Sequence, residues 1–290
     1  MTTDRWAQWL LTRRDGNSDA LRARHAASLA AYRDGVLDRA DLASDDILLD
    51  VGCGTGLIGF GALDRLGPNG RVIFSDVSGD LLDECRRGAG GDERCTFVQA
   101  SAEDLASIPD ASVDVVTTRS VLIYCERKAT AFGEFFRVLR PGGRISLFEP
   151  INRFSLQHPD GLFGLRESPV DDLLAKIREV YWGGGDTDAQ RSMVDFDERD
   201  LLDWAVTAGF EAVQLEYRAE VGVPDEPITD WEALKRAAPN PLAPTYGEAI
   251  ASALTEDERE RLDAHIAALA AARTPTRRTL ATAFLRARRP

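Results

Sequence analysis

A short apolar run that leads directly into three closely spaced glycines constrains the fold of this chain most. Residues 47–51 read Ile-Leu-Leu-Asp-Val, and Gly52, Gly54 and Gly56 follow at alternate positions. A strand that turns through such a loop into a helix places backbone N–H groups and a helix N-terminus beside a ligand. Glycine is needed there because a Cβ would collide with a close ligand or resist positive φ. The pattern predicts a ligand-binding loop at the start of an α/β unit.

Strands and helices alternate through the next part of the chain. Turn signals such as Gly67-Pro68-Asn69-Gly70 separate them. Strands joined by helices in this way predict a mostly parallel sheet that is covered by helices on both faces. The expected strands lie at 47–51, 71–76, 95–99, 113–118 and 144–148, and two more at 210–221 and 279–286 bring the total to seven.

The segments outside this alternation predict helical additions to the sheet. Residues 1–46 carry apolar side chains at helical spacing and are expected to form an N-terminal cap. Residues 47–150 are the expected binding core, and residues 151–290 complete the sheet. Within that last part we expect lid insertions at 151–195 and 224–275, which are rich in turn signals, proline and alanine.

Charge and cysteine content exclude several classes of function. The 290 residues carry a net charge of −13, whereas a surface that binds nucleic acid is strongly basic. No run of about 18 apolar residues occurs, and the mixed residues 1–14 do not resemble a signal peptide. We therefore expect no nucleic-acid or membrane partner and a cytoplasmic location. The four cysteines lack zinc-ligand spacing, which predicts free thiols and no metal site.

The spacing of the glycines argues against the commonest rival ligand. A dinucleotide loop of the form G-x-G-x-x-G requires glycine at position 57, where this chain has Leu57. The acidic residue that ends the second expected strand, Asp76, faces the same crevice as the loop in an open parallel sheet. A carboxylate there can accept hydrogen bonds from both hydroxyls of a ribose. Taken alone, Asp76 could equally be a turn or helix-cap residue.

Five motifs in order resemble class I S-adenosylmethionine-dependent methyltransferases. The similarity covers about 47–150, and it is closest to the branch with ubiquinone/menaquinone-biosynthesis and arsenite methyltransferases. It implies a Rossmann-like sheet and S-adenosylmethionine as the cofactor. The motifs that carry the resemblance are Leu48–Gly56, Val72–Val77, Ser101–Leu105, Pro109–Val116 and Arg137–Arg144.

The resemblance also implies which residues bind the cofactor. The glycine loop would wrap the methionine part, with Asp50 supporting the loop, and Asp76 would hold the ribose. Val77 would pack on the adenine, and Ser101 stands where the family often has Asp. The residues implied at the cofactor are Asp50, Gly52, Cys53, Gly54, Gly56, Asp76, Val77, Ser101, Ala102, Glu103 and Arg119.

Residues for the methyl acceptor are harder to predict. Methyl transfer needs orientation and exclusion of water, and a base only where the acceptor must lose a proton. His158, after the fifth strand, is the candidate base, or else a residue that stabilises its loop. Tyr124, Glu149 and Trp182 are candidate substrate residues, with core packing the alternative for Trp182. The scattered cysteines argue against arsenic as the acceptor.

The leading hypothesis is therefore a methyltransferase that acts on a small organic molecule, as a monomer or a homodimer. Two alternatives stay open. One is another group transfer or a non-methyl reaction on the same fold, and the other is a non-catalytic, regulatory protein that keeps the cofactor pocket. The sequence identifies neither the acceptor nor the atom that is methylated.

Overall fold

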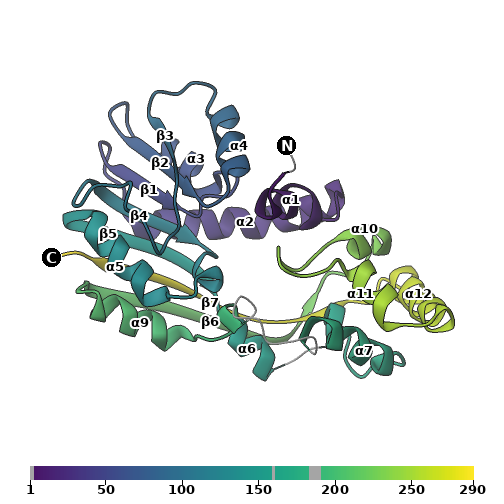
Figure 1. Cartoon of the computed structure of the whole chain (residues 1–290). Coiled ribbons are helices and arrows are strands. Elements are labelled where there is room, and N and C mark those ends of the chain that lie inside the picture. Colours follow the sequence, from purple (N-terminus) through teal and green to yellow (C-terminus); the bar gives the residue numbers. More distant parts are fainter. Residues whose placement is uncertain (1–2, 159–160, 183–190) are drawn as a thin grey trace.

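The computed structural model describes residues 3–158, 161–182 and 191–290, and within these ranges a single seven-stranded sheet is the centre of the fold (Figure 1). Its strand order is β3-β2-β1-β4-β5-β7-β6. The first five strands run parallel, and β7 lies antiparallel between β5 and β6. The predicted seven-stranded, mostly parallel sheet is confirmed. The strands are β1 (Ile47–Val51), β2 (Arg71–Asp76), β3 (Cys95–Gln99), β4 (Val113–Arg119), β5 (Leu139–Pro150), β6 (Glu211–Asp225) and β7 (Thr276–Arg288).

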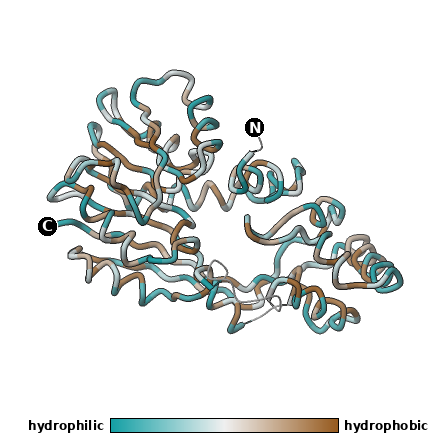
Figure 2. Tube along the Cα trace, viewed as in Figure 1, coloured by the Kyte–Doolittle hydropathy of each residue, from teal (hydrophilic) through white to brown (hydrophobic). Residues whose placement is uncertain are grey.

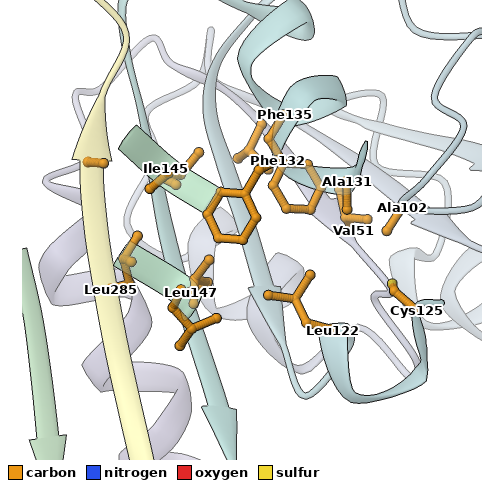
Figure 3. Close-up of a cluster of buried hydrophobic side chains, with 14 of the residues drawn as sticks. Val51, Ala102, Leu122, Cys125, Ala131, Phe132, Phe135, Ile145, Leu147 and Leu285 are labelled. Atoms are coloured by element: carbon orange, nitrogen blue, oxygen red, sulfur yellow. The ribbon is translucent and has the colours of Figure 1, made fainter. Parts of the chain in front are cut away.

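Helices cover both faces of the sheet because neighbouring strand residues point to opposite sides. Leu48 packs with the face that α2, α3 and α4 cover, whereas Leu49 packs with the face that α5 and α9 cover. Figure 3 shows Phe132 and Phe135 of α5 over Ile145 on this second face. These helices are α2 (Asp19–Ala40), α3 (Leu57–Leu63), α4 (Gly79–Ala89), α5 (Lys128–Val138) and α9 (Glu198–Thr207).

A second group of helices, here called the cap, lies beyond the ends of β6 and β7 (Figure 1). It has its own hydrophobic core, in which Leu174, Ile177, Ile250, Leu262 and Ile266 are buried together. Figure 2 shows hydrophobic residues along the strands of the sheet and again among these helices. The cap consists of α7 (Asp171–Trp182), α10 (Trp231–Arg236), α11 (Tyr246–Ala253) and α12 (Glu256–Ala271), and the short elements α6 (Asn152–Gln157) and η3 (Leu162–Gly164) lead into it.

The N-terminal helices connect the sheet to the cap. They are α1 (Arg5–Gln8) and the π-helical turn η1 (Trp9–Arg13). The indole N–H of Trp9 donates to the carbonyl of Ala238 at 2.9 Å, and the N–H of Ala238 donates to the carbonyl of Arg13 at 2.8 Å. On the other side, the N–H of Asp4 donates to Asp80 of α4 at 2.7 Å, so the N-terminal segment contacts both the cap and a helix of the sheet domain.

Two helices of the cap were not expected from the sequence. Residues 224–255 contain five prolines, which indicate a loop, yet α10 and α11 form there. Each begins at a side-chain cap: Asp230 accepts from Ala233 N, and Thr245 forms a capping box with Glu248. No helix in the described part of the chain is both long and apolar enough to cross a bilayer.

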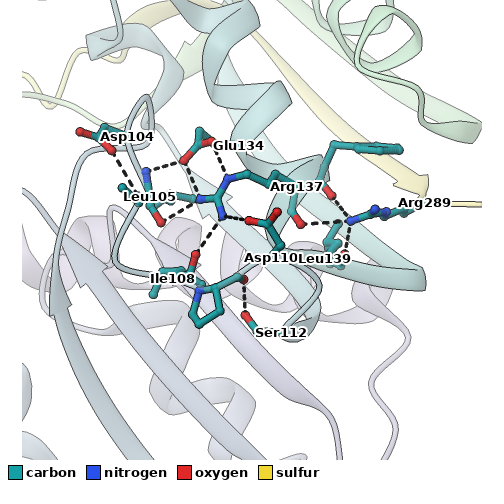
Figure 4. A network of polar contacts seen from close by, with 12 residues as sticks. Asp104, Leu105, Ile108, Asp110, Ser112, Glu134, Arg137, Leu139 and Arg289 are labelled. Atoms are coloured by element: carbon teal, nitrogen blue, oxygen red, sulfur yellow. Dashed lines mark hydrogen bonds and ion pairs between the residues drawn. The ribbon is translucent and has the colours of Figure 1, made fainter.

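Arg137, near the end of α5, is the first residue of the motif at 137–144 and connects α5 to the loop between β3 and β4. Arg137 forms ion pairs with Glu134 (2.8 Å) and Asp110 (2.6 Å), and it donates to the carbonyl groups of Leu105 and Ile108 (Figure 4). The loop between β3 and β4 is thus tied to α5. This loop begins next to the expected adenine side of the site, so Arg137 positions that side without touching it.

Candidate active site

The loop after β1 adopts a backbone conformation that favours glycine. Gly52, Gly54 and Gly56 have φ of +65°, +56° and +84°. A Cβ on Gly52 would lie 2.3 Å from Cγ2 of Val121, and a Cβ on Gly56 would lie 2.4 Å from the ring of Phe60. Conformation and close packing thus both require glycine at positions 52 and 56. Gly56 caps α3 and does not line the cavities described below.

Asp76, the last residue of β2, forms hydrogen bonds with the loop after β1 and with the turn after β2. Its Oδ2 accepts the backbone N–H of Gly54 at 2.9 Å, and its Oδ1 accepts the N–H of Ser78 at 2.9 Å. The carboxyl is buried, and this burial raises its pKa. It also lines the cavity beside the loop, so its free lone pairs can accept from a ligand. Asp76 therefore caps a turn and also lines the cavity, whereas its contact with a ribose stays a prediction.

Asp50 supports the loop from below. Its Oδ2 accepts the N–H of Gly59 at 3.0 Å, and Thr117 donates its hydroxyl to Oδ1 at 3.2 Å. Burial raises the pKa of Asp50 to about 7. A carboxyl poised at this value can lie close to a ligand's cationic amino group and become ionised there.

Two adjoining cavities follow this loop, at the point where the strand order reverses between β1 and β4. The larger, of about 160 Å³, is lined by Asp76, Val77 and residues 100–103. The smaller, of about 90 Å³, is lined by Asp50 and residues 52–55. Val77 is 45% exposed although it is apolar, which suits a side chain on which a flat ring packs. We call the two together the donor cavity.

The structure brings nearly all predicted cofactor residues to this place. Only Gly56 is absent from the walls of the donor cavity. Ser101 accepts the N–H of Glu103 at 3.2 Å, and the Glu103 carboxylate accepts the N–H of Arg127. Which of them contact a bound cofactor stays a prediction.

The N-terminal helices supply wall residues that sequence reasoning missed. Trp6, Trp9 and Leu10 all line the donor cavity. They are held by Asp4, which accepts the hydroxyl of Ser78 at 2.6 Å, two residues beyond Asp76. The pair of tryptophans in a mostly polar helix was the available signal, but helical spacing does not say which ligand such a face covers.

A third cavity, of about 550 Å³, opens beside the donor cavity and is here called the acceptor cavity. The common wall residues of the two are Trp9, Arg14, Leu29, Arg119, Ser120 and Tyr124. Most of the remaining described wall residues come from α6, α7, the segment 191–194 and the cap segment that follows α10. An outer cavity of about 890 Å³ continues from it toward solvent, with Leu156 and other residues lining both.

The structure separates the predicted acceptor residues. Tyr124 lies between the donor and acceptor cavities, with its ring 5.0 Å from that of Trp6. His158 is exposed, packs on Phe154 at 4.6 Å between ring centroids, and lines the outer cavity. Trp182 ends α7, and its side chain lies outside the described residues.

Glu149 lies behind the cavity wall. It is fully buried, and its Oε1 accepts the N–H groups of Val121 at 2.9 Å and Leu122 at 3.0 Å. Its Oε2 has no partner among the described residues, and burial raises its pKa to about 7. These bonds hold the loop at Ser120, which has a left-handed φ of +57°. Glu149 thus shapes the wall and does not line it.

The cysteines do not form a thiol cluster at the acceptor cavity. All four are free thiols. Cys53 and Cys85 lie with their sulfurs 4.0 Å apart under the glycine loop, and Cys125 lines the donor cavity. No metal-binding group of His, Cys, Asp or Glu side chains occurs in the described ranges.

Comparison with known proteins agrees with this geometry. Residues 49–147 match the family model of a methyltransferase domain. Relatives that the chain matches are named as methyltransferases, and together with this domain they support the class I S-adenosylmethionine-dependent superfamily. S-adenosylmethionine is the cofactor of this superfamily, and the paired Asp76 carboxylate, the glycine loop and the exposed Val77 fit its ribose, methionine and adenine parts.

Two curated relatives show how far the sequence similarity extends. The arsenite methyltransferase of Halobacterium salinarum is 29% identical over 187 residues, which cover 60% of this chain and 48% of that protein. The ubiquinone/menaquinone biosynthesis C-methyltransferase UbiE of Ruegeria sp. is 28% identical over 187 residues, which cover 62% and 72%. The chain thus spans about half the length of the first relative.

Solved structures share the fold at low sequence identity. A methyltransferase described as putative from Bacillus halodurans has a TM-score of 0.54 at 17% identity, over 91% of this chain and 99% of that one. Phosphoethanolamine N-methyltransferase 2 of Haemonchus contortus, in complex with S-adenosylhomocysteine, has a TM-score of 0.50 at 15% identity, over 89% and 52%. These likenesses support the fold class.

Proposed function

We propose that this protein transfers the methyl group of S-adenosylmethionine to a small organic molecule bound in the acceptor cavity. The observation that carries the proposal is the wall common to the two cavities. Arg119 and Tyr124 line both of them, so a donor and an acceptor would meet at these side chains. Methyl transfer by in-line displacement needs this kind of direct access.

The chain's own residues position the reactants and keep water away. When bound, S-adenosylmethionine supplies a methyl group whose bond to sulfur breaks, leaving the electron pair on sulfur as the acceptor's lone pair forms the new bond. Asp76 holds the ribose side, and Trp6 and Trp9 cover the donor cavity. An acceptor that must lose a proton needs a base, and His158 is the candidate proposed from the sequence. Arsenite is a poor candidate, because the thiols do not converge on the acceptor cavity.

The test has two steps. Calorimetry with S-adenosylmethionine and S-adenosylhomocysteine measures cofactor binding to the full chain; absence of binding to both would overturn the proposal. Incubation with methyl-labelled cofactor and a cell metabolite extract then reports any molecule that gains one labelled methyl group. Cofactor binding without any labelled product would favour a regulatory cofactor-binding protein instead.

We also infer a cytoplasmic location and a monomer or homodimer. The free thiols support a reducing compartment, since cytosolic proteins keep their cysteines reduced. Cell fractionation checks the first inference, and light scattering on the eluting protein checks the second. A secreted protein, or an assembly larger than a dimer, would contradict them.

A further inference from the structure

The walls of the acceptor cavity combine apolar side chains with positive charge. Arg119, Arg191 and Arg14 line it, the last paired with Asp15 at 2.8 Å behind the wall, while none of its described wall residues is Asp or Glu. The other walls are mainly apolar and include the rings of Trp9 and Tyr246. This is unusual for a chain whose net charge is −13, because a cavity drawn from an average part of it would be acidic.

Arg119 has no carboxylate partner for its charge. Within the described residues its side chain donates only to the hydroxyl of Ser120, at a long 3.4 Å, and it forms no ion pair. Asp50 and Glu149 act on it through space, but neither forms an ion pair with it: Asp50 accepts from Gly59 and Thr117, and Glu149 accepts from the loop after β4 through Oε1 alone. A guanidinium confined among apolar walls is costly unless an anion pairs with it.

The outer cavity extends the same positive charge toward solvent. Its described wall includes five arginines and two carboxylate residues. Asp225 pairs with Arg24 at 3.4 Å and Arg278 at 3.5 Å, and Arg14 pairs with Asp15, so the excess positive charge of this wall comes from Arg277 and Arg178 against Glu179. Arg178 on α7 forms no ion pair with the described residues. An entrance with this charge raises the local concentration of anions and speeds their entry.

We propose that the acceptor is an organic acid, with a flat or aliphatic apolar body between the aromatic walls and an anionic group at the arginines of the acceptor cavity. This rests on the proposed function, because it names the acceptor class of that site. Planar guanidinium groups bind carboxylate, sulfonate or phosphate oxygens through two parallel hydrogen bonds. The apolar walls account for the body of the molecule, and Arg119 accounts for its charge.

A matched pair of fluorescent probes tests the charge preference. 1-Anilinonaphthalene-8-sulfonate and N-phenyl-1-naphthylamine have the same ring system and differ by the sulfonate. Both are titrated into the full chain saturated with S-adenosylhomocysteine, so that the donor cavity is filled. We expect the sulfonate to bind at least about tenfold more tightly, a difference of about 1.4 kcal/mol. Equal binding of both probes, or tighter binding of the neutral one, would overturn the proposal.

Arginine variants locate the preference. Arg119→Gln and Arg191→Gln are expected to lower the affinity for the sulfonate and leave that for the neutral probe nearly unchanged. Arg65→Gln is the matched control, since Arg65 pairs with Asp38 on the surface outside these cavities. If the Arg119→Gln/Arg191→Gln double variant still binds the sulfonate more tightly than the neutral probe, the sulfonate binds outside the acceptor cavity and the proposal is overturned. Thermal unfolding checks that each variant is folded.

The two proposals fail separately. Arg119 also lines the donor cavity, whereas Arg191 lines the acceptor cavity alone. If Arg119→Gln weakens S-adenosylhomocysteine binding and Arg191→Gln leaves the probe preference intact, Arg119 serves the cofactor and the acid proposal is wrong. If S-adenosylhomocysteine does not bind the wild-type protein at all, the methyltransferase proposal fails, and the probe comparison still reports the charge preference of the cavity.

Discussion

Trp9 donates its indole N–H to the backbone carbonyl of Ala238, and this contact joins the N-terminal helices to the cap. Trp9 also lines both the donor and the acceptor cavity. One contact between distant parts of the chain therefore helps to close both cavities. Variants that loosen this junction are expected to affect cofactor binding although they lie outside the glycine loop.

Gly16 offers a test of the junction. It has φ of +55°, and a Cβ there would lie 2.0 Å from the carbonyl oxygen of Ala233 in the cap. Gly16→Ala should therefore lower the free energy of unfolding by more than the roughly 1–2 kcal/mol cost of left-handed backbone, and should weaken cofactor binding. Gly142→Ala is the control, because Gly142 also has a positive φ, of +80°, but a Cβ added there would have no neighbouring atom within 4 Å. Urea unfolding measures the stability of each variant, and calorimetry measures its cofactor affinity. Equal losses for Gly16→Ala and Gly142→Ala would contradict the prediction.

Asp76→Asn tests the ribose assignment. An amide can replace only one of the two acceptor oxygens that bind Gly54 and Ser78, and it lacks the charge that strengthens hydrogen bonds to ribose. Calorimetry should show a loss of roughly 1.5–3 kcal/mol in S-adenosylmethionine binding, which is at least about tenfold in affinity. Asp92→Asn is the control, since Asp92 also accepts a backbone N–H but pairs with Arg94 away from the site. Unchanged affinity in Asp76→Asn would remove the assignment.

Glu149→Gln predicts a change in the pH dependence of stability. Burial raises the pKa of Glu149 from 4.5 to about 7, so the folded protein holds a proton there that the unfolded chain has lost. This contribution is present near pH 5 and is lost as the pH rises through 7. Gln keeps the acceptor for Val121 and Leu122 and cannot ionise. Its stability relative to wild type should therefore rise between pH 5 and pH 8, by about 1–3 kcal/mol.

Urea unfolding at the two pH values measures this difference. Asp50 also has a pKa raised to about 7, but it is present in both proteins and cancels in the comparison. Parallel stability profiles for Glu149→Gln and wild type would show that Glu149 does not titrate in this range.

His158→Gln separates a base from an entrance residue. A general base contributes about 100-fold to 10,000-fold to turnover. Because His158 lines only the outer cavity, we expect kcat on the identified acceptor to stay nearly unchanged and KM to rise. His265→Gln is the control, since His265 contacts Ser168 within the cap at 2.9 Å. A large fall in kcat for His158→Gln alone would restore His158 as the base.

Local sequence signals were sufficient for the sheet and the donor loop. Short-range patterns of apolar, glycine and acidic residues specify the strand at 47–51 and the acid at 76. In a parallel sheet the loops that follow the strands lie at one edge, so these two segments were expected to lie together. The structure has β1 and β2 at the predicted residues. β5 starts earlier than predicted, at Leu139, because this residue pairs with Val113 across a bulge. The predicted division into an N-terminal helical segment (1–46), a binding core (47–150) and a remainder with lid insertions (151–290) stays a prediction.

Features that depend on long-range packing could not be read in this way. The helices α10 and α11 are short and lie among prolines, and their stability comes from the core of the cap more than from helix propensity. The roles of Trp9 and Glu149 depend on partners far away in the chain, Ala238 and the loop after β4. Its place near the end of the fifth strand suggested a substrate contact for Glu149, whereas the fold places it behind the wall.

The place of β7 bears on how the molecule assembles during synthesis. β7 is the last of the seven strands to leave the ribosome, yet it lies between β5 and β6. β6 therefore has no strand to pair with while the ribosome synthesises α10, α11 and α12. The parallel strands β1 to β5 need none of these later segments for their own pairing. We expect a nascent chain to complete its donor loop first and to enclose an acceptor only after its final strand has docked.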